Sequence, residues 1–243
     1  MAVAERIVES NCVALAGVQL HVGSQIQAAE PYAVATRAML DFAADVRDDL
    51  GVEIDVLDMG GGLPIPYDEA VPGTGEIVET IARAIEERCS QHGLSQPTLF
   101  LEPGRRLVGT AGALVGTVGA IKETPGGTFA VLDVGTNAVG THWQYPIYAL
   151  DGGDATRTYD VAGPLCYTGD VIQEAVALPE LTRGDRLVVD RVGAYSLGSA
   201  SHTNATPKPP VVLLRESGEA ELIRPRETCC DVVGDDRVPD DLQ

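Results

Sequence analysis

The chain has 243 residues, of which 44% are hydrophobic and 22% are charged, and its 36 acidic side chains outnumber 17 basic ones. This length is enough for one or two packed domains, and the hydrophobic content excludes a chain that is disordered throughout. No run of about 18 apolar residues predicts a transmembrane helix, and the first residues lack the basic region and apolar core of a signal peptide. The net charge of −19 argues against a protein that binds nucleic acid, because the phosphates would be repelled.

The acidic residues are spread along the chain, whereas only two of the basic residues, Lys122 and Lys208, are lysines. Such an anionic surface repels itself in dilute buffer, and salt screens the repulsion. Two explanations stay open at this point: a host cytoplasm with very high salt, or an arginine-biased, GC-rich genome.

The chain contains five cysteines, which are Cys12, Cys89, Cys166, Cys229 and Cys230. Their odd number and loose spacing predict reduced thiols in the cytoplasm rather than a disulfide framework. No pair has the spacing of a zinc site, so no bound metal is expected.

Up to about residue 105, strand-like and helix-like segments alternate. Apolar residues recur at helical spacing over residues 31–50, where Gly51 provides a stop, and again over residues 75–91. Short strands are predicted over residues 16–22, 54–57 and 98–101. This alternation predicts parallel strands joined by right-handed crossovers, as in an α/β fold.

After about residue 110, short β-rich segments alternate with turns such as Pro125–Gly127. The predicted strands cover residues 113–121, 128–132, 186–192 and 211–214. This pattern is typical of an antiparallel β domain. The sequence therefore predicts an α/β part over residues 1–109 and a β part over residues 110–243.

Polar or glycine-rich residues lie at or just after the end of each of the three strands predicted in the first part. They are His21 and Ser24, then Gly60, Gly61 and Gly62 before a helix, then Glu102, Gly104 and Arg105. Ligands bind at the carboxyl ends of parallel strands, and a glycine loop lets backbone N–H groups approach an anion. Arg105 and Ser24 add donors suited to a phosphate. Each feature alone is more often structural, but their order predicts one anion site.

Two more motifs follow in the second part. The five motifs, in chain order, are HVGSQ, DMGGGLP, EPGRRLVG, GPLCYTGD and GAYS. In this order they resemble the fold-III pyridoxal-phosphate decarboxylases, the ornithine/diaminopimelate/arginine decarboxylase family. The resemblance covers nearly the whole chain. It implies the last strands of an alanine-racemase-like (β/α) barrel over residues 1–109 and a sandwich- or barrel-like β domain over residues 110–243.

The resemblance implies pyridoxal 5′-phosphate (PLP) as cofactor and decarboxylation of an amino acid as reaction. His21 would stack on the cofactor ring and take part in catalysis, and Glu102 would pair with the pyridine nitrogen. A carboxylate there keeps the ring protonated and makes it a strong electron sink. The phosphate would be held by Ser24, Gly60, Gly61, Gly62, Gly104, Arg105 and Tyr195.

Cys166 resembles the catalytic cysteine that reprotonates the substrate across a dimer interface; its structural alternative is a small buried apolar residue. Two substrate-site residues depart from the family. Tyr167 stands where the family has an acid, and Tyr145, in the stretch 143–146, stands where diaminopimelate decarboxylases have an arginine. Neither diaminopimelate nor ornithine is therefore assigned as substrate, and a less polar amino acid becomes possible.

The family's Schiff-base lysine lies on the first barrel strand, and neither Lys122 nor Lys208 corresponds to it. The expected active form is a homodimer, or a heteromer with a lysine-bearing barrel half. Four interpretations stay open. They are a split decarboxylase, a truncated start assigned to an ordinary gene, a catalytically silent relative with a binding or regulatory role, and a non-enzymatic adaptor.

Overall fold

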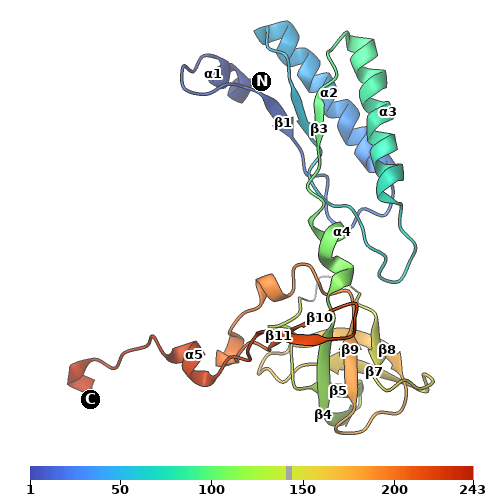
Figure 1. Ribbon diagram of the computed structural model, residues 1–243, viewed down its shortest axis with the longest axis vertical. Helices are drawn as coiled ribbons and strands as arrows, with labels where there is room; N and C mark the ends of the chain where they lie inside the picture. Colours follow the sequence, from blue (N-terminus) through green and yellow to red (C-terminus); the bar gives the residue numbers. More distant parts are fainter. Residues whose placement is uncertain (141–143, 243) are drawn as a thin grey trace. The chain divides into compact units, whose positions relative to one another are not determined.

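The protein is described by a computed structural model that covers residues 1–140 and 144–242 and divides into two compact units, Met1–Gly109 and Thr110–Gln243. The elements of the first unit are α1 (Ala2–Val8), β1 (Gly17–Gln19), α2 (Glu30–Leu50), β2 (Val56–Asp58), α3 (Thr74–His92), β3 (Thr98–Phe100) and α4 (Gly104–Val108). Figure 1 traces the elements of both units.

The first unit is built on a parallel sheet with strand order β1-β2-β3. Both long helices, α2 and α3, lie on the same side of this sheet (Figure 1). Leu57 of β2 is fully buried beneath them, whereas Phe100 of β3 points to the other face and is 52% exposed. The unit is therefore a partial (β/α) barrel with one covered face, which confirms the predicted fold class.

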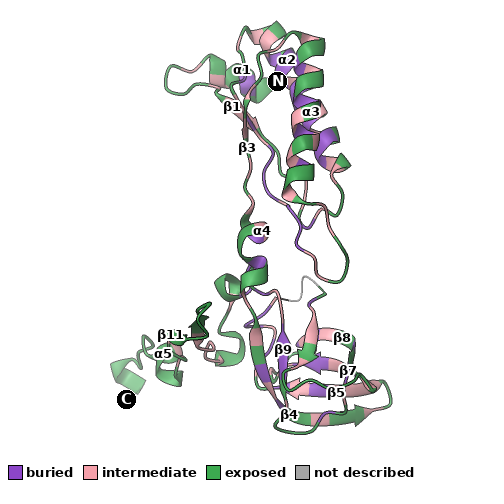
Figure 2. Cartoon of the chain, turned by 45° about the vertical axis from the view of Figure 1, so that its right-hand side comes forward, coloured by how far each residue is buried: buried purple, intermediate pink, exposed green. Residues whose placement is uncertain are grey.

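The two helices form because apolar side chains recur along one stripe of each. On α2 the stripe includes Tyr32, Leu40 and Val46, and the helix ends at Gly51, whose φ of 69° suits a glycine. The buried stripe of α3 consists of Ile77, Ile81, Ala84, Ile85 and Cys89. Figure 2 shows these buried stripes on the inner sides of the helices.

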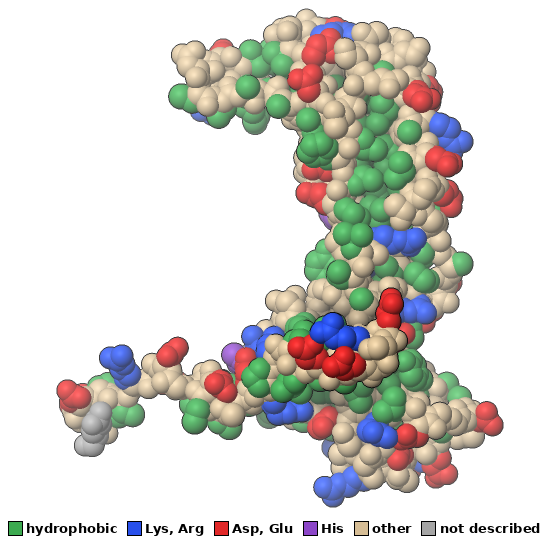
Figure 3. Space-filling model, viewed as in Figure 1, with side chains coloured by type: hydrophobic (Ala, Val, Ile, Leu, Met, Phe, Trp, Pro, Cys, Tyr) green, Lys and Arg blue, Asp and Glu red, His purple; other side chains and the backbone are tan. Residues whose placement is uncertain are grey.

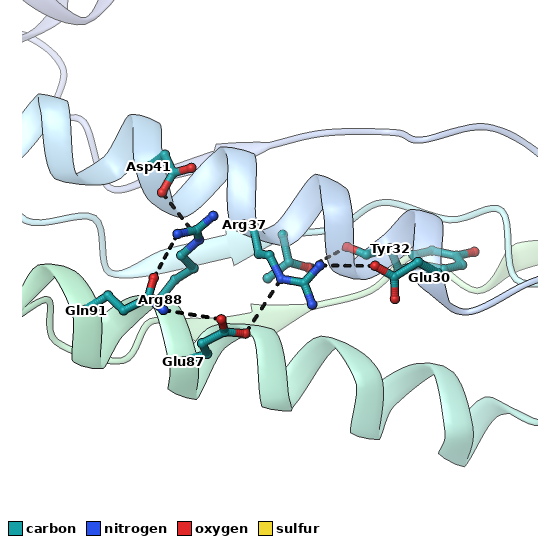
Figure 4. Close-up of polar contacts among 8 residues, drawn as sticks. Glu30, Tyr32, Arg37, Asp41, Glu87, Arg88 and Gln91 are labelled. Atoms are coloured by element: carbon teal, nitrogen blue, oxygen red, sulfur yellow. Dashed lines mark hydrogen bonds and ion pairs between the residues drawn. The ribbon is translucent and has the colours of Figure 1, made fainter.

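Charged residues also join α2 to α3. Arg37 of α2 lies 3.1 Å from Glu30 on its own helix and 3.7 Å from Glu87 of α3, and Arg88 of α3 lies 3.5 Å from Asp41 (Figure 4). These pairs are partly exposed, so each contributes little to stability.

The second unit contains a six-stranded sheet of order β6-β9-β4-β5-β7-β8 and a separate hairpin, β10-β11. Its strands are β4 (Leu114–Thr124), β5 (Gly127–Leu132), β6 (Ile147–Ala149), β7 (Arg157–Ala162), β8 (Val171–Leu178), β9 (Arg186–Val189), β10 (Val211–Leu214) and β11 (Ala220–Arg224). The helical segments are α5 (Cys229–Val233) and four 3₁₀ turns, η1 (Gly109–Ala111), η2 (Leu197–Ser199), η3 (Thr203–Ala205) and η4 (Asp240–Leu242). All pairs are antiparallel except β5–β7, which is parallel, so the predicted antiparallel β domain is confirmed with one exception.

Among the described residues, no helix is long and apolar enough to cross a membrane. Acidic side chains are distributed over both units, as Figure 3 shows for one face. All five cysteines are free thiols, and of these only Cys89 is buried.

Candidate cofactor-binding site

The segments that follow β1, β2 and β3 remain side by side beyond the ends of the strands. Leu20 donates its N–H to the carbonyl of Asp58 (3.0 Å), and Met59 donates to that of Phe100 (3.1 Å). Beyond them, Glu102 donates to the carbonyl of Gly60 (2.9 Å). These hydrogen bonds bring the predicted residues of the first unit together at one edge of the sheet.

The three glycines allow this close approach of the chain segments. A Cβ atom on Gly61 would lie 2.6 Å from the carbonyl oxygen of Glu102, and one on Gly62 would lie 2.2 Å from that of Gly23. Gly60 and Gly62 also have φ angles of 66° and 85°, which favour glycine. The glycines are therefore required first by the packing of neighbouring strand ends.

Two of the glycine amides already have partners within the unit. Gly60 donates its N–H to Asp58 Oδ1 (2.9 Å), and Gly61 donates to His21 Nδ1 (3.3 Å). The helix predicted after the glycines is confirmed as α3, although residues 63–73 separate the glycines from its first residue, Thr74. Anion binding at this edge therefore depends more on side-chain donors than the sequence suggested.

His21 is exposed and is oriented by its bond to Gly61. Because Nδ1 accepts the backbone hydrogen, the ring's own hydrogen is placed on Nε2 in the neutral form. The backbone thus fixes the plane of the ring next to the glycine segment. A flat ring held in this way is suited to lie against a planar ligand.

Arg105 is the charged centre of the edge. It is only 6% exposed, yet it comes from α4, directly after the exposed Glu102 and Gly104. Its Nη1 donates to the Tyr67 hydroxyl over 2.7 Å, and its Nη2 lies 3.4 Å from the hydroxyl of Ser24. Segments that follow all three strands therefore converge on one guanidinium.

This set of groups fits the phosphate of PLP. A buried guanidinium beside a serine hydroxyl is a strong donor arrangement for an oxyanion, and the site is exposed on the Ser24 side. The sequence identified Arg105 and Ser24 but missed Tyr67. The proximity of Tyr67 depends on the path of a loop without repeating pattern, and the aromatic residue in Gly-Gly-Gly-Leu-Pro-Ile-Pro-Tyr was the only signal.

In the second unit, Cys166 and Tyr167 lie on an exposed loop that Asp170 closes. The buried carboxylate of Asp170 accepts hydrogen bonds from the N–H of Leu165 (2.7 Å) and from both the N–H (2.7 Å) and the hydroxyl (2.9 Å) of Thr136. Cys166 is exposed, so the alternative that it is a small buried residue does not hold within this unit.

The other predicted residues of the second unit differ in exposure. Tyr195 is 57% exposed and has a φ of 58°, an unusual conformation for tyrosine, between the buried Ala194 and Ser196. Tyr145 is only 1% exposed, and Trp143 of the same stretch lies outside the described residues. Tyr167 is 60% exposed, and its ring lies against Gly169.

The chain is similar to known proteins over most of its length. Residues 1–109 match the family described as pyridoxal-dependent decarboxylase, pyridoxal binding domain. The diaminopimelate decarboxylase of Methanothermobacter thermautotrophicus is 35% identical over 231 residues, which are 92% of this chain and 54% of that protein. The diaminopimelate decarboxylase of Bacillus subtilis is 36% identical over 239 residues, which are 94% of this chain and 54% of that protein.

Solved structures show the same similarity. Diaminopimelate decarboxylase from M. jannaschii in complex with L-lysine matches with a TM-score of 0.90 and 33% identity, over 100% of this chain and 56% of that one. The Helicobacter pylori enzyme in complex with L-lysine matches with a TM-score of 0.82 and 26% identity, over 96% of this chain and 58% of that one. The chain belongs to the fold-III family of PLP-dependent decarboxylases and spans about half the length of the relatives it matches.

Proposed function

We propose that this chain supplies the phosphate- and ring-binding part of the active site of a PLP-dependent amino-acid decarboxylase. The observation that carries the proposal is the buried guanidinium of Arg105, held beside Ser24 at the carboxyl ends of three parallel strands. This arrangement lies within the unit that matches a pyridoxal binding domain.

In this proposal Arg105 and Ser24 bind the phosphate, with Gly60, Gly61, Gly62 and Gly104 shaping the edge. The family resemblance also implies Tyr195 as a phosphate ligand. His21, with its ring held by Gly61, lies against the cofactor. Glu102 is exposed and would pair with the pyridine nitrogen, where its negative charge would favour the protonated ring. When bound, PLP supplies an electron-accepting ring that allows loss of CO₂ from the substrate.

Cys166 is proposed to hold the proton that returns to the substrate carbon. Its exposure and its place on a loop closed by Asp170 support this role. We assign it to an active site shared between two copies of the assembled enzyme, as the family resemblance implies.

The covalent partner of the cofactor is assigned to a lysine-bearing barrel half. Lys122 lies in β4 and Lys208 precedes β10, so both lysines belong to the second unit. In the first unit, β1 and β3 are the outer strands, and Phe100 is exposed on the face that the helices do not cover. Further β/α repeats would pair with these strands and cover this face.

The proposed substrate is an amino acid. Tyr167 offers a hydroxyl and a ring face where the family has an acid, which suits a less polar distal group than a free amine. Tyr145 is buried within its unit and is assigned to the substrate region as the residue that replaces an arginine. The five cysteines, none of which is paired in a disulfide, support a place in the cytoplasm.

Release of CO₂ tests the proposed function. The chain with PLP is incubated with diaminopimelate, lysine, ornithine, arginine and leucine, alone and with the lysine-bearing half of the M. jannaschii enzyme. We expect no release by the chain alone and release with the added half, which Glu102→Gln reduces strongly. Release that is unchanged in Glu102→Gln would remove Glu102 from the site.

A catalytically silent relative is the second candidate, favoured by the two tyrosines that replace charged residues of the family, Tyr145 and Tyr167. Such a protein would bind PLP or a partner without releasing CO₂. Binding of PLP without turnover, in the presence of a lysine-bearing half that pairs stably with the chain, would favour this alternative.

A further inference from the structure

The loop that follows the glycines, residues 63–67, is held rigidly although it has no regular secondary structure. Leu63 and Ile65 are each 1% exposed. The side chain of Gln25 brackets Ile65, because its Oε1 accepts the N–H of Ile65 (3.1 Å) and its amide donates to the Ile65 carbonyl. Gln25 has a φ of 56°, a conformation that a non-glycine residue keeps only when its surroundings fix it.

The same loop is tied to α4. Arg106 donates from Nη1 to the carbonyl of Pro64 over 2.8 Å. Pro64 and Pro66 each restrict their own φ angle. Because Gln25 of the segment after β1 and Arg106 of α4 both hold this loop, the residue at its end, Tyr67, has a fixed position relative to Arg105.

We infer that Tyr67 is a positioning residue that holds the guanidinium of Arg105 for the phosphate of the cofactor. Its hydroxyl accepts a 2.7 Å hydrogen bond from Arg105 Nη1, whereas Nη2 of the same guanidinium lies 3.4 Å from Ser24. This inference rests on the proposed function, since it assumes that the anion at this edge is the phosphate of PLP.

The physical reason is preorganisation. An arginine side chain has many rotamers, and a free guanidinium would lose that freedom each time it binds an anion. The bond to Tyr67 restricts the guanidinium before the ligand arrives, with its Nη2 directed toward Ser24 and its plane fixed by a rigid loop. Tyr67 therefore acts selectively on ligands that carry a phosphate, and not on the ring of the cofactor.

The test compares PLP with pyridoxal, which lacks the phosphate. Dissociation constants of both ligands are measured by equilibrium dialysis for the unmodified chain, for Tyr67→Phe and for Tyr159→Phe. Tyr159 is a matched control, because it is a buried tyrosine of the second unit whose hydroxyl accepts the N–H of Leu181 (2.9 Å). Thermal melts of all three proteins show whether a change in a dissociation constant merely reflects a loss of stability.

We expect the preference for PLP over pyridoxal to fall about tenfold in Tyr67→Phe and to remain in Tyr159→Phe. Should Tyr67→Phe keep the full preference, the positioning role is overturned while the proposed function stands. Should the unmodified chain show no preference for PLP, the proposed phosphate site is wrong and the inference is overturned with it.

A second variant covers the case in which Tyr67→Phe does not fold. Gln25→Ala does not alter Tyr67 or Arg105 themselves, but it removes both hydrogen bonds that hold Ile65. We expect this variant, like Tyr67→Phe, to have a lower preference for PLP over pyridoxal, because the loop then no longer fixes Tyr67. An unchanged preference in a folded Gln25→Ala protein would contradict the rigid-loop argument and overturn the inference.

Discussion

At the scale of single residues, buried polar groups do more to define the candidate site than any motif taken alone. Arg105 lies between Tyr67 and Ser24, and Asp170 closes the loop of Cys166. In both cases a charged side chain that is more than nine-tenths buried has its hydrogen bonds supplied by loops. Loss of one partner leaves a buried group unsatisfied, so substitutions at these positions have large and measurable effects.

Asp170→Asn is expected to destabilise the second unit by about 2–3 kcal/mol. The NH₂ group of the asparagine would face an N–H donor and could not accept its hydrogen bond. Urea unfolding measures this change. Asp133→Asn is the control, because Asp133 is exposed and accepts one bond, from the N–H of Thr117 (2.8 Å). Equal effects of the two substitutions would show that the three hydrogen bonds to Asp170 do not stabilise the loop.

Glu227 gives the chain a pH-dependent contribution to stability. The N–H of Lys208 and the ring of His202 donate to its carboxylate, and these bonds lower the pKa of Glu227. A lowered pKa means that the contribution is complete above the usual carboxylate range and is lost as the pH falls through the lowered value.

We therefore expect Glu227→Gln to be less stable than the unmodified chain at neutral pH, with the difference disappearing as the pH falls through the lowered pKa of Glu227. Denaturant unfolding at several pH values measures it. Glu219→Gln, which removes an exposed carboxylate 3.9 Å from Arg215, serves as the control with little effect at any pH. A Glu227 difference that grows on acidification would contradict the assignment.

At the scale of elements, the two long helices, α2 and α3, were predictable to within a residue because their signals are local. The apolar stripe and Gly51 together define α2, and the predicted helix over residues 75–91 corresponds to α3 (Thr74–His92). The strands of the first unit are shorter than predicted. The residues that flank them form hydrogen bonds with neighbouring segments but have no regular strand structure. Strands β6, β7, β8 and β11 were not predicted. β6 has only three residues, and register shifts between β7 and β8 interrupt the alternation of their side chains.

The candidate site was predictable only in part, for a similar reason. His21, Ser24, Glu102 and Arg105 follow strands that the sequence marks clearly, so their convergence could be expected. Tyr67 could not be placed, because its position depends on how a loop of eleven residues, 63–73, folds back over Gln25 and Arg106. Tertiary contacts of this kind leave no periodic trace in a sequence.

Gly61→Ala is expected to separate the ends of β2 and β3. The added Cβ would lie 2.6 Å from the backbone carbonyl of Glu102, which cannot move without breaking its own segment, and we expect a loss of about 2–3 kcal/mol. The matched control is Gly75→Ala in the first turn of α3, where nothing lies within 4 Å. That substitution should stabilise the helix by about 0.5–1 kcal/mol. Thermal or urea unfolding that ranks the two variants the other way round would refute the close approach.

At the scale of the whole molecule, the charge of −19 dominates behaviour in solution. Acidic side chains lie on the surface of both units, so their mutual repulsion acts against the compact state (Figure 3). We expect the melting temperature to rise as NaCl is increased from about 0.1 M to 1 M, where the screening length falls to about 3 Å. A melting temperature that does not respond to salt would show that this repulsion is already balanced by local pairing.

The central claim is that this chain carries the phosphate-binding half of a PLP site but not the lysine that fixes the cofactor. The most direct measurement is equilibrium dialysis of the purified chain against PLP and pyridoxal, followed by borohydride reduction and mass spectrometry. The account predicts about one PLP bound per chain, weaker binding of pyridoxal, and no cofactor fixed to Lys122 or Lys208 at that stoichiometry. Absence of PLP binding, or full reduction onto either lysine, would contradict it.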